Sequence, residues 1–334
     1  MRAFEIHEFG VDQLVLAERE TPSPGPYQVL VRLRAASLNY RDLMVVEGQY
    51  NPKLRRPIVP LSDGVGLVDA VGDNVTRFRP GDRVAGSFMQ TWIDGAVDRD
   101  KANSAMGGAI DGVLSEYRLF HEEGLVATPP HLSDVEASTL PCAAVTAWHA
   151  LFEERPAQLG DSVLIQGTGG VALFALQFAH AAGLRSIVLS SSDAKIERAR
   201  ELGATDTVNY RAHPDWDKAV RALLPAGTDY VIELGGGDTI ALSLRAVRIG
   251  GMIAVIGALG GAATAISPVP VLMNSLRLQG IYVGSRRMFE RMNRAIELHG
   301  IRPVVDRVFS WLDIKEALTY MRQQSHVGKI CMQF

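Results

Sequence analysis

The chain has 334 residues, enough for two domains, and it is 47% hydrophobic and 21% charged, as in ordinary globular proteins. A formal net charge of -3 offers no strongly basic surface for nucleic acid, and no apolar run approaches the roughly 20 residues of a membrane span. Two cysteines cannot build a disulfide framework, and residues 1–10 lack the apolar core of a signal peptide. We therefore expect a cytoplasmic protein that binds neither nucleic acid nor membrane.

The first third of the chain predicts short strands separated by turns. A strand-like run at 29–33 follows three early prolines, and glycine-containing strand-and-turn segments occupy 64–72 and 80–86. Turns of this kind suit a β-rich, partly open barrel.

From about residue 133 the pattern changes to alternating strands and helices, beginning with a predicted capping box formed by Ser133 and Glu136. Strands are predicted at 163–166, 187–189, 207–210, 230–234, 253–256 and 278–283, and helices at 171–182, 194–202 and 217–224. This alternation predicts βαβ units, hence an α/β fold with a doubly wound parallel sheet and helices on both faces. The tail from residue 287 predicts a helix, a strand and a second helix.

The sequence VLIQGTGGVALFALQFAHAAG places a glycine loop directly after the first strand of this alternating region. Glycine allows a tight turn and a close approach of the backbone to a pyrophosphate, and the following helix presents free N–H groups to it. We therefore predict that a dinucleotide binds at Gly167, Thr168, Gly169, Gly170 and Val171. The alternative is a glycine turn with a purely structural role.

The residues after the second strand of this region bear on the choice between NAD and NADP. An NAD site places Asp or Glu about 20 positions after the glycine loop, where the carboxylate holds the ribose 2′-OH. Here stand Ser190, Ser191 and, on the next helix, Lys195, whose hydroxyls and ammonium suit a 2′-phosphate. We expect NADP(H) in preference to NAD(H). The alternative is that Ser192 or Asp193 caps the helix and Lys195 is a solvated charge.

Six segments, in the same order, resemble motifs of the medium-chain dehydrogenase/reductase superfamily. They are SLNYRDLMVVEGQY (37–50), GVGLVDAVGDNVTRFRPGDRVAG (64–86), DGVLSEY (111–117), LPCAAVTAWHAL (140–151), ARELGATDTVNY (199–210) and HVGKICMQF (326–334). The resemblance implies a GroES-like catalytic domain at 1–127 and a Rossmann nucleotide-binding domain at 128–275. Residues 276–334 would carry the last sheet strand and return to the catalytic domain. Relatives pair through the edge of the cofactor-domain sheet, which implies a homodimer, with a tetramer as the alternative.

Zinc alcohol dehydrogenases of this superfamily hold the catalytic metal with three protein ligands, usually Cys, His and a third Cys or carboxylate. In this sequence Asn39, Tyr40 and Arg41 occupy the stretch of the missing first cysteine, Ser62-Asp63 corresponds to the family's His-Glu pair, and Cys142 falls where a third ligand would lie; the stretch 88–112 lacks the four cysteines of a structural zinc. We therefore expect no zinc and a resemblance closest to the quinone oxidoreductase branch. Without a metal, a hydrophobic quinone, enone or carbonyl acceptor that delocalises charge is easier to reduce.

The resemblance also implies two catalytic candidates. Tyr50 has a setting similar to that of the tyrosine donor in zinc-free enoyl reductases; the alternative is an aromatic core or lid residue. Asn39 resembles the asparagine that contacts the nicotinamide ribose or amide, because an amide offers both a donor and an acceptor; the alternative is a turn residue. Asp42 is expected to cap a helix or to pair with Arg41.

Further cofactor contacts follow from family position and from the carboxyl edge of the sheet. They are Thr146 near the nicotinamide, Tyr210 near the adenine or the 2′-phosphate, Gly257 and Ala258 after the fifth strand, and Gly284 and Ser285 after the sixth. Arg286 and Lys329 are weaker candidates for phosphate contacts, with ordinary surface charge as the alternative.

Three functions stay open at this point. The first is NADPH-dependent reduction of quinones or activated alkenes, and the second is an NAD(P)-dependent alcohol dehydrogenase or carbonyl reductase. The third is a non-catalytic, nucleotide-binding structural protein. The missing zinc ligands count against the second function. Turnover would separate the third function from the others, and acceptor preference would separate the first two.

Overall fold

The computed structural model describes residues 1–237, 239–257 and 265–334, and these form two compact units. The first unit combines residues 1–145 with 283–334, and the second consists of residues 146–282. The domain limits expected from the sequence, after residues 127 and 275, stay predictions.

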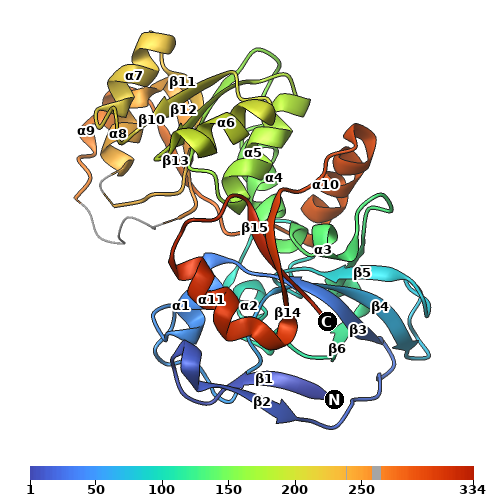
Figure 1. The fold of residues 1–334 in the computed structure, drawn as a ribbon. Coiled ribbons are helices and arrows are strands. Elements are labelled where there is room, and N and C mark those ends of the chain that lie inside the picture. The colour runs from blue at the N-terminus through green and yellow to red at the C-terminus, as the bar shows by residue number, and fades with distance from the viewer. Residues whose placement is uncertain (238, 258–264) are drawn as a thin grey trace. The chain divides into compact units, whose positions relative to one another are not determined.

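The first unit is built on a seven-stranded sheet of order β14-β15-β3-β4-β5-β7, in which β6 also pairs with β3 (Figure 1). A separate pair, β1 with β2, completes its strands. The strands are β1 (Arg2–Ile6), β2 (Leu14–Glu18), β3 (Gln28–Ser37), β4 (Asp63–Val71), β5 (Arg83–Gly86), β6 (Tyr117–His121), β7 (Leu125–Ala127), β14 (Val305–Ser310) and β15 (Lys329–Gln333).

Short helices cover this sheet, and the predicted capping box of Ser133 and Glu136 opens one of them. The helices are α1 (Tyr40–Val46), α2 (Arg99–Ala102), α3 (Asp134–Ala137), α10 (Arg286–His299) and α11 (Ile314–Arg322), with one-turn helices at Val11–Gln13, Glu122–Gly124 and Trp311–Asp313 and a π-helix at Leu140–Ala144.

The last strand of the chain joins one of the first. The tail predicted as helix, strand and helix ends in a further strand, β15, which pairs antiparallel with β3 so that Cys331 lies opposite Ser37. One hydrophobic core contains residues from both ends of the chain, among them Val31 of β3 and Leu318 of α11. The C-terminal segment is therefore part of the first unit.

The second unit contains the parallel sheet that the sequence predicts, so the α/β, doubly wound fold class is confirmed. Its strand order is β10-β9-β8-β11-β12-β13, and every pairing is parallel. The strands are β8 (Ser162–Gln166), β9 (Arg185–Ser190), β10 (Asp206–Asn209), β11 (Thr228–Glu233), β12 (Val247–Val255) and β13 (Arg277–Gly280). The helices are α4 (Val145–Phe152), α5 (Gly170–Ala181), α6 (Asp193–Glu201), α7 (Trp216–Leu223), α8 (Thr239–Ala246) and α9 (Val269–Met273).

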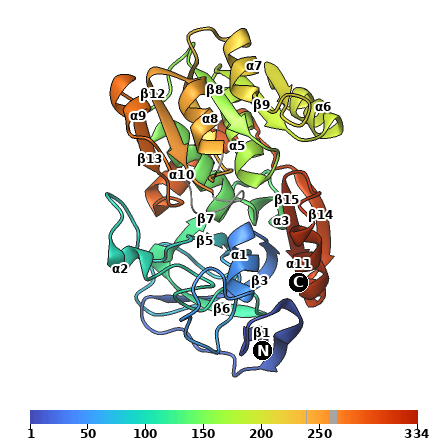
Figure 2. The same cartoon turned by 90° about the vertical axis from the view of Figure 1, so that its left-hand side faces the viewer.

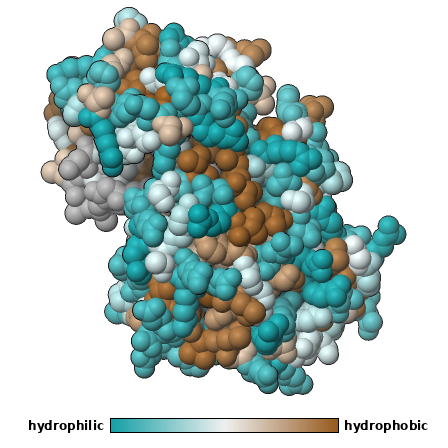
Figure 3. Space-filling view, viewed as in Figure 1, coloured by the Kyte–Doolittle hydropathy of each residue, from teal (hydrophilic) through white to brown (hydrophobic). Residues whose placement is uncertain are grey.

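Helices lie on both faces of this sheet, with α5 and α6 on one face and α7 packed against α8 on the other (Figures 1 and 2). The amphipathic pattern of α6 explains its position, since only Ile196 and Ala199 of DAKIERARE are buried. Its outer surface is hydrophilic in Figure 3. Among the described residues, no helix combines the length and the apolar character needed to cross a bilayer.

Candidate active site

The glycine loop lies at the carboxyl end of β8, in the centre of the parallel sheet, and leads directly into α5. Gly167 has a φ of 81°, a conformation that favours glycine, and a Cβ added at Gly167 or Gly169 would meet no atom within 4 Å. Gly169 is the N-cap of α5, and it offers no side chain to the first N–H groups of the helix. The open space and the helix N-terminus together fit a pyrophosphate.

A buried carboxylate that the sequence did not single out ties this loop to the neighbouring strand. Glu233 ends β11 and is fully buried, and it accepts hydrogen bonds from Gln166 Nε2 at 2.7 Å, from Thr239 Oγ1 at 2.7 Å and from the hydroxyl of Ser243. The N–H groups of Gly235 and Gly236 donate to the same side chain at 3.0 and 2.9 Å.

Gln166 closes this network from the other side. Its Oε1 accepts from the backbone N–H of Leu234 at 3.1 Å and of Gly235 at 3.0 Å. Because Gln166 is the residue directly before Gly167, the network fixes the start of the glycine loop. The sequence signal that could have indicated this network is a polar residue at the end of each of two apolar strands, Gln166 in β8 and Glu233 in β11.

The residues predicted to select the nucleotide lie at the ends of β9 and β10. Tyr210 donates its backbone N–H to Ser190 O at 3.0 Å, which brings these two candidates together. The hydroxyl-bearing Ser190 is buried, whereas the ring of Tyr210 is 40% exposed. Ser191 and Lys195 are half-buried, and Ser192 is the N-cap of α6.

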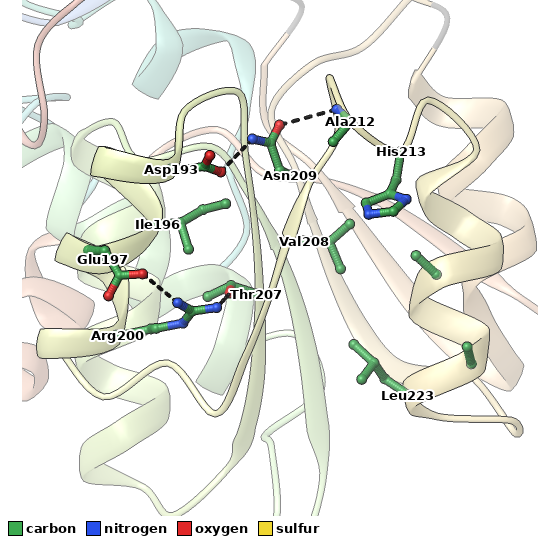
Figure 4. Close-up of a pocket in the computed structure, with 12 residues that line it drawn as sticks. Asp193, Ile196, Glu197, Arg200, Thr207, Val208, Asn209, Ala212, His213 and Leu223 are labelled. Atoms are coloured by element: carbon green, nitrogen blue, oxygen red, sulfur yellow. Dashed lines mark hydrogen bonds and ion pairs between the residues drawn. The ribbon is translucent and has the colours of Figure 1, made fainter.

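A groove of about 550 Å³ runs beside these residues between α6, β10 and α7 (Figure 4). At one end Asn209 donates to the carboxylate of Asp193 at 2.7 Å, so this carboxylate is tied to the end of β10. Toward the other end of the groove, Arg200 pairs with Glu197 and donates to Thr207 Oγ1 at 2.9 Å. The polar groups of the groove therefore largely satisfy one another.

The other predicted cofactor residues are divided between the units. Thr146 is buried in α4, and Gly257 follows β12 with its N–H bonded to Glu233 O at 3.2 Å. Ala258 lies outside the described residues. Gly284 and Ser285 belong to the first unit, where the hydroxyl of the buried Ser285 accepts from Met288 N and caps α10.

In the first unit, a buried polar cluster surrounds the start of α1. Asn39 is the N-cap residue, and its backbone N–H donates to Asp42 Oδ2 at 2.8 Å. Its side-chain Oδ1 accepts from Lys329 Nζ at 2.7 Å, and its Nδ2 donates to Ser62 Oγ at 3.4 Å. Asn39 is thus more than a turn residue, because three polar groups fix its backbone and its amide.

Asp63 occupies the centre of this cluster and is fully buried. Ser62 Oγ donates to its Oδ1 at 2.8 Å, the backbone N–H of Cys142 donates to its Oδ2 at 3.2 Å, and the ammonium of Lys329 lies 3.9 Å from Oδ2. Burial raises the pKa of the Asp63 carboxyl, while the Lys329 ammonium acts in the opposite direction.

Tyr50 lies just beyond α1, where its ring is 41% exposed and contacts a cation. The guanidinium of Arg41 lies 5.1 Å from the centre of the Tyr50 ring and 4.7 Å from that of Phe88. Arg41 also donates to Met106 O at 2.9 Å and pairs with Asp42 at 3.6 Å. The two expected roles of Asp42, helix cap and ion-pair partner, are both confirmed. Its burial raises the pKa of Asp42 to about 6.

Comparison with known proteins agrees with this architecture. The family model for the alcohol dehydrogenase GroES-like domain matches residues 25–130, and the model for a zinc-binding dehydrogenase matches 170–298. A zinc-type alcohol dehydrogenase-like protein of Schizosaccharomyces pombe is 43% identical over 97% of this chain and 96% of its own length. The chain belongs to the medium-chain dehydrogenase/reductase superfamily.

Other members of the superfamily extend the likeness. Human quinone oxidoreductase is 26% identical over 95% of this chain and 92% of its own length. The crystal structure of an NAD-dependent alcohol dehydrogenase superposes with a TM-score of 0.91 at 33% identity, with full coverage of both chains. Membership of this superfamily makes the protein an oxidoreductase that depends on a nicotinamide nucleotide.

Because one matched family is described as zinc-binding, the donors at the cluster can be tested against zinc. The stretches that the resemblance assigns to the three ligands carry an amide (Asn39), a hydroxyl beside a carboxylate (Ser62, Asp63) and a thiol (Cys142), and burial raises the pKa of that thiol. The ammonium of Lys329 is already bound between Asn39 and Asp63. In the described part of the chain, no group of three His, Cys, Asp or Glu side chains could hold a metal ion. These donors do not fit zinc.

Two residues that were considered for phosphate contacts have other partners. Lys329 is buried in the polar cluster, and the side chain of Arg286 is 11% exposed and pairs with Glu123 at 2.7 Å. The alternative of an ordinary surface charge is therefore wrong for both. The pattern around Lys329, an isolated lysine near the C-terminus, gave no signal of its burial.

Proposed function

We propose that the protein is a zinc-independent, NADPH-dependent oxidoreductase that reduces quinones or conjugated C=C and C=O bonds by hydride transfer. The observation that carries this proposal is the polar cluster of the first unit, where an amide and a hydroxyl lie in the stretches that the resemblance assigns to metal ligands and a lysine ammonium donates to the amide. Similarity to human quinone oxidoreductase supports the same conclusion.

A conjugated acceptor suits these residues. The bound nucleotide supplies the hydride, and the negative charge that then develops on the acceptor is already delocalised, so hydrogen-bond donors can stabilise it without a Lewis acid. We propose Tyr50 as the donor to the acceptor oxygen, because its hydroxyl belongs to a partly exposed ring whose position is fixed by Arg41. We propose that Asn39 binds the nicotinamide end of the cofactor.

For the nucleotide, the preference for NADPH rests on Ser191, Lys195 and Tyr210. The carboxylate closest in sequence to the end of β9, Asp193, is held by Asn209 and is therefore less available to a ribose 2′-OH. Lys195 and Tyr210 would contact the 2′-phosphate. We propose that the glycine loop and the start of α5 bind the pyrophosphate.

An alternative function is an NAD(P)-dependent alcohol dehydrogenase or carbonyl reductase. Similarity to proteins named as alcohol dehydrogenases favours it. The donors of the polar cluster count against it, because removing hydride from a simple alcohol is easier when a metal stabilises the alkoxide.

The two functions can be separated by one experiment on the purified full-length chain. Oxidation of NADPH and of NADH is followed by nicotinamide absorbance after exhaustive chelator treatment, with a quinone, an enone and a simple aldehyde as acceptors. We expect NADPH-dependent turnover of the quinone or enone, unchanged by the chelator. Activity with the aldehyde alone, or activity lost on chelation and restored by Zn²⁺, would refute the proposal and support the alternative.

We also propose that the protein forms a homodimer through the free edge of β13. Among the strands that the structure describes, β13 pairs with β12 alone, and the neighbouring α9 exposes Val269, Leu272 and Met273, of which Leu272 is 76% exposed. Such a patch suits contact with a second copy. Both cysteines are free thiols, which suits a reducing compartment, and we propose the cytoplasm as the location.

A further inference from the structure

Segment 88–108 lies in the stretch that lacks the cysteines of a structural zinc, yet it is compact. Its two ends are joined to each other, because the N–H of Met106 donates to Phe88 O at 3.0 Å. Its large apolar side chains are all buried, namely Phe88, Met89, Trp92 and Met106. The segment is therefore a packed part of the first unit, and its contacts with neighbouring elements show what holds it there.

The middle of the segment is attached to the start of α10 through the backbone. The N–H of Arg286 donates to Trp92 O at 2.9 Å, and the N–H of Arg287 donates to Ile93 O at 3.1 Å. The two ends of the segment have a different kind of contact, which is made by the side chain of Arg41 in α1.

The guanidinium of Arg41 contacts both ends of the segment. It donates to Met106 O at 2.9 Å, and its central carbon lies over the ring of Phe88, 4.7 Å from the ring centre. Gly108 leaves room for it, because a Cβ added there would lie 2.6 Å from Nη2 of Arg41. The Arg41 side chain is only 11% exposed, and a cation over an aromatic ring is held more strongly when both are removed from water.

The same guanidinium also contacts the residue proposed as the donor to the acceptor. Its central carbon lies 5.1 Å from the centre of the Tyr50 ring, and the carboxylate of Asp42, 3.6 Å from Arg41, balances its charge. A guanidinium is rigid and planar, with its hydrogen-bond donors in fixed directions. The positions of Tyr50, Phe88 and Met106 are therefore linked through one side chain.

We propose that Arg41 is a positioning residue that joins segment 88–108 to Tyr50, so that the segment and the Tyr50 hydroxyl keep a fixed geometry toward the acceptor. This inference rests on the proposed function, in which Tyr50 donates to the acceptor oxygen. Tyr50 is 41% exposed, so the loss of the guanidinium would remove a contact that limits the rotamers of its ring.

The first test is a double-mutant cycle on the full-length protein with Arg41→Met, Tyr50→Phe and the double variant. With NADPH and a benzoquinone, we expect Arg41→Met to lower kcat about tenfold, as for the loss of one well-placed hydrogen bond to the transition state. In the Tyr50→Phe background the same change should alter kcat less than about twofold, because the hydroxyl that Arg41 positions is already absent. An equal loss of kcat in both backgrounds would overturn the inference.

The second test, hydrogen exchange followed by mass spectrometry, does not depend on turnover. We expect Arg41→Met to speed exchange over residues 104–110 about tenfold and to leave exchange over β12 unchanged. The matched control is Arg56→Met, because the exposed Arg56 lies over the ring of Phe9 in the same unit, 4.3 Å from the ring centre. This control should change neither kcat nor exchange over residues 104–110.

A further pair of variants separates positioning from the effect of a buried charge. Arg41→Met leaves the Asp42 carboxylate buried without its cation, so the variant Arg41→Met/Asp42→Asn is compared with Asp42→Asn alone. Exchange over residues 104–110 should again be about tenfold faster without Arg41, and equal exchange in these two proteins would overturn the inference. If the wild type reduces none of the acceptors while exchange responds to Arg41, the proposed function fails and the anchoring of segment 88–108 by Arg41 stands.

Discussion

Replacing Glu233 by alanine tests whether the carboxylate below the glycine loop holds that loop in place. Five donors converge on this fully buried side chain, from Gln166, Thr239, Ser243, Gly235 and Gly236. The substitution removes the acceptor and leaves the donors, which is the costly way of breaking a buried network.

The loss of stability expected for Glu233→Ala can be estimated from the donors that have no second acceptor. Thr239 Oγ1 also donates to Gly236 O at 2.7 Å, and Gly235 N also donates to Gln166 Oε1 at 3.0 Å, so both keep a partner. Gln166 Nε2 keeps Ser243 Oγ at 2.9 Å. The Ser243 hydroxyl and the Gly236 N–H lose Glu233 as their acceptor. At about 1–3 kcal/mol for each unsatisfied group, the free energy of unfolding should fall by roughly 4 kcal/mol.

Urea unfolding followed by tryptophan fluorescence measures this loss, since Trp216 is buried in the same unit. The matched control is Glu201→Ala, which removes a glutamate whose side chain is 63% exposed and paired with Arg198 on α6. That change should cost less than about 0.5 kcal/mol. Glu233→Ala should also weaken NADPH binding, because Gln166 directly precedes Gly167.

A Glu233→Ala variant as stable as Glu201→Ala would refute the reasoning, because it would mean that water or relaxation satisfies the freed donors. A variant that loses stability but binds NADPH with unchanged affinity would refute only the link to the loop. In that case the network stabilises the sheet without determining the geometry of the phosphate site.

Three further predictions can be tested separately. Burial raises the pKa of Asp42 to about 6 from 3.8, so ionisation of this carboxyl opposes folding as pH rises from about 4 to about 6. Urea titrations should show that the free energy of unfolding of the wild type falls by up to about 3 kcal/mol relative to that of Asp42→Asn across this pH range. A difference between the two proteins that stays constant with pH would contradict this prediction. Burial raises the pKa of Cys331 to about 12, so a thiol reagent should label it in urea but hardly in the native protein, and fast native labelling would show that the strand opens. Leu272→Glu should shift the protein from dimer to monomer in light scattering, whereas a dimer that persists would place the interface elsewhere.

The features predicted correctly from the sequence are those determined by neighbouring residues. The glycine loop, the strand before it and the helix after it lie within about 20 consecutive residues. The alternation of apolar and amphipathic segments likewise predicts the order in which strands and helices follow one another along the chain. The capping box at Ser133 and Glu136 is equally local, since both groups lie within one helical turn.

The features that sequence reasoning missed depend on pairings between distant segments. Lys329 meets Asn39 across 290 positions, and Glu233 meets Gln166 across 67. The residues around Lys329 do not distinguish a buried cation from a surface charge, and the local sign of Glu233 is limited to its place at the end of an apolar strand. The strand β15 was missed for the same reason, because its pairing with β3 rather than its own short pattern defines it.

The same pairing places a residue of the C-terminal strand in the polar cluster. In the first unit, the carbonyl end of the Asn39 amide, which we propose to bind the cofactor, accepts a hydrogen bond from the Lys329 ammonium at the start of β15. A shift of β15 by one residue would turn Lys329 to the other face of the sheet, because side chains alternate along a strand. Catalysis by this protein should therefore depend on the register between β15 and β3, which Cys331 opposite Ser37 defines.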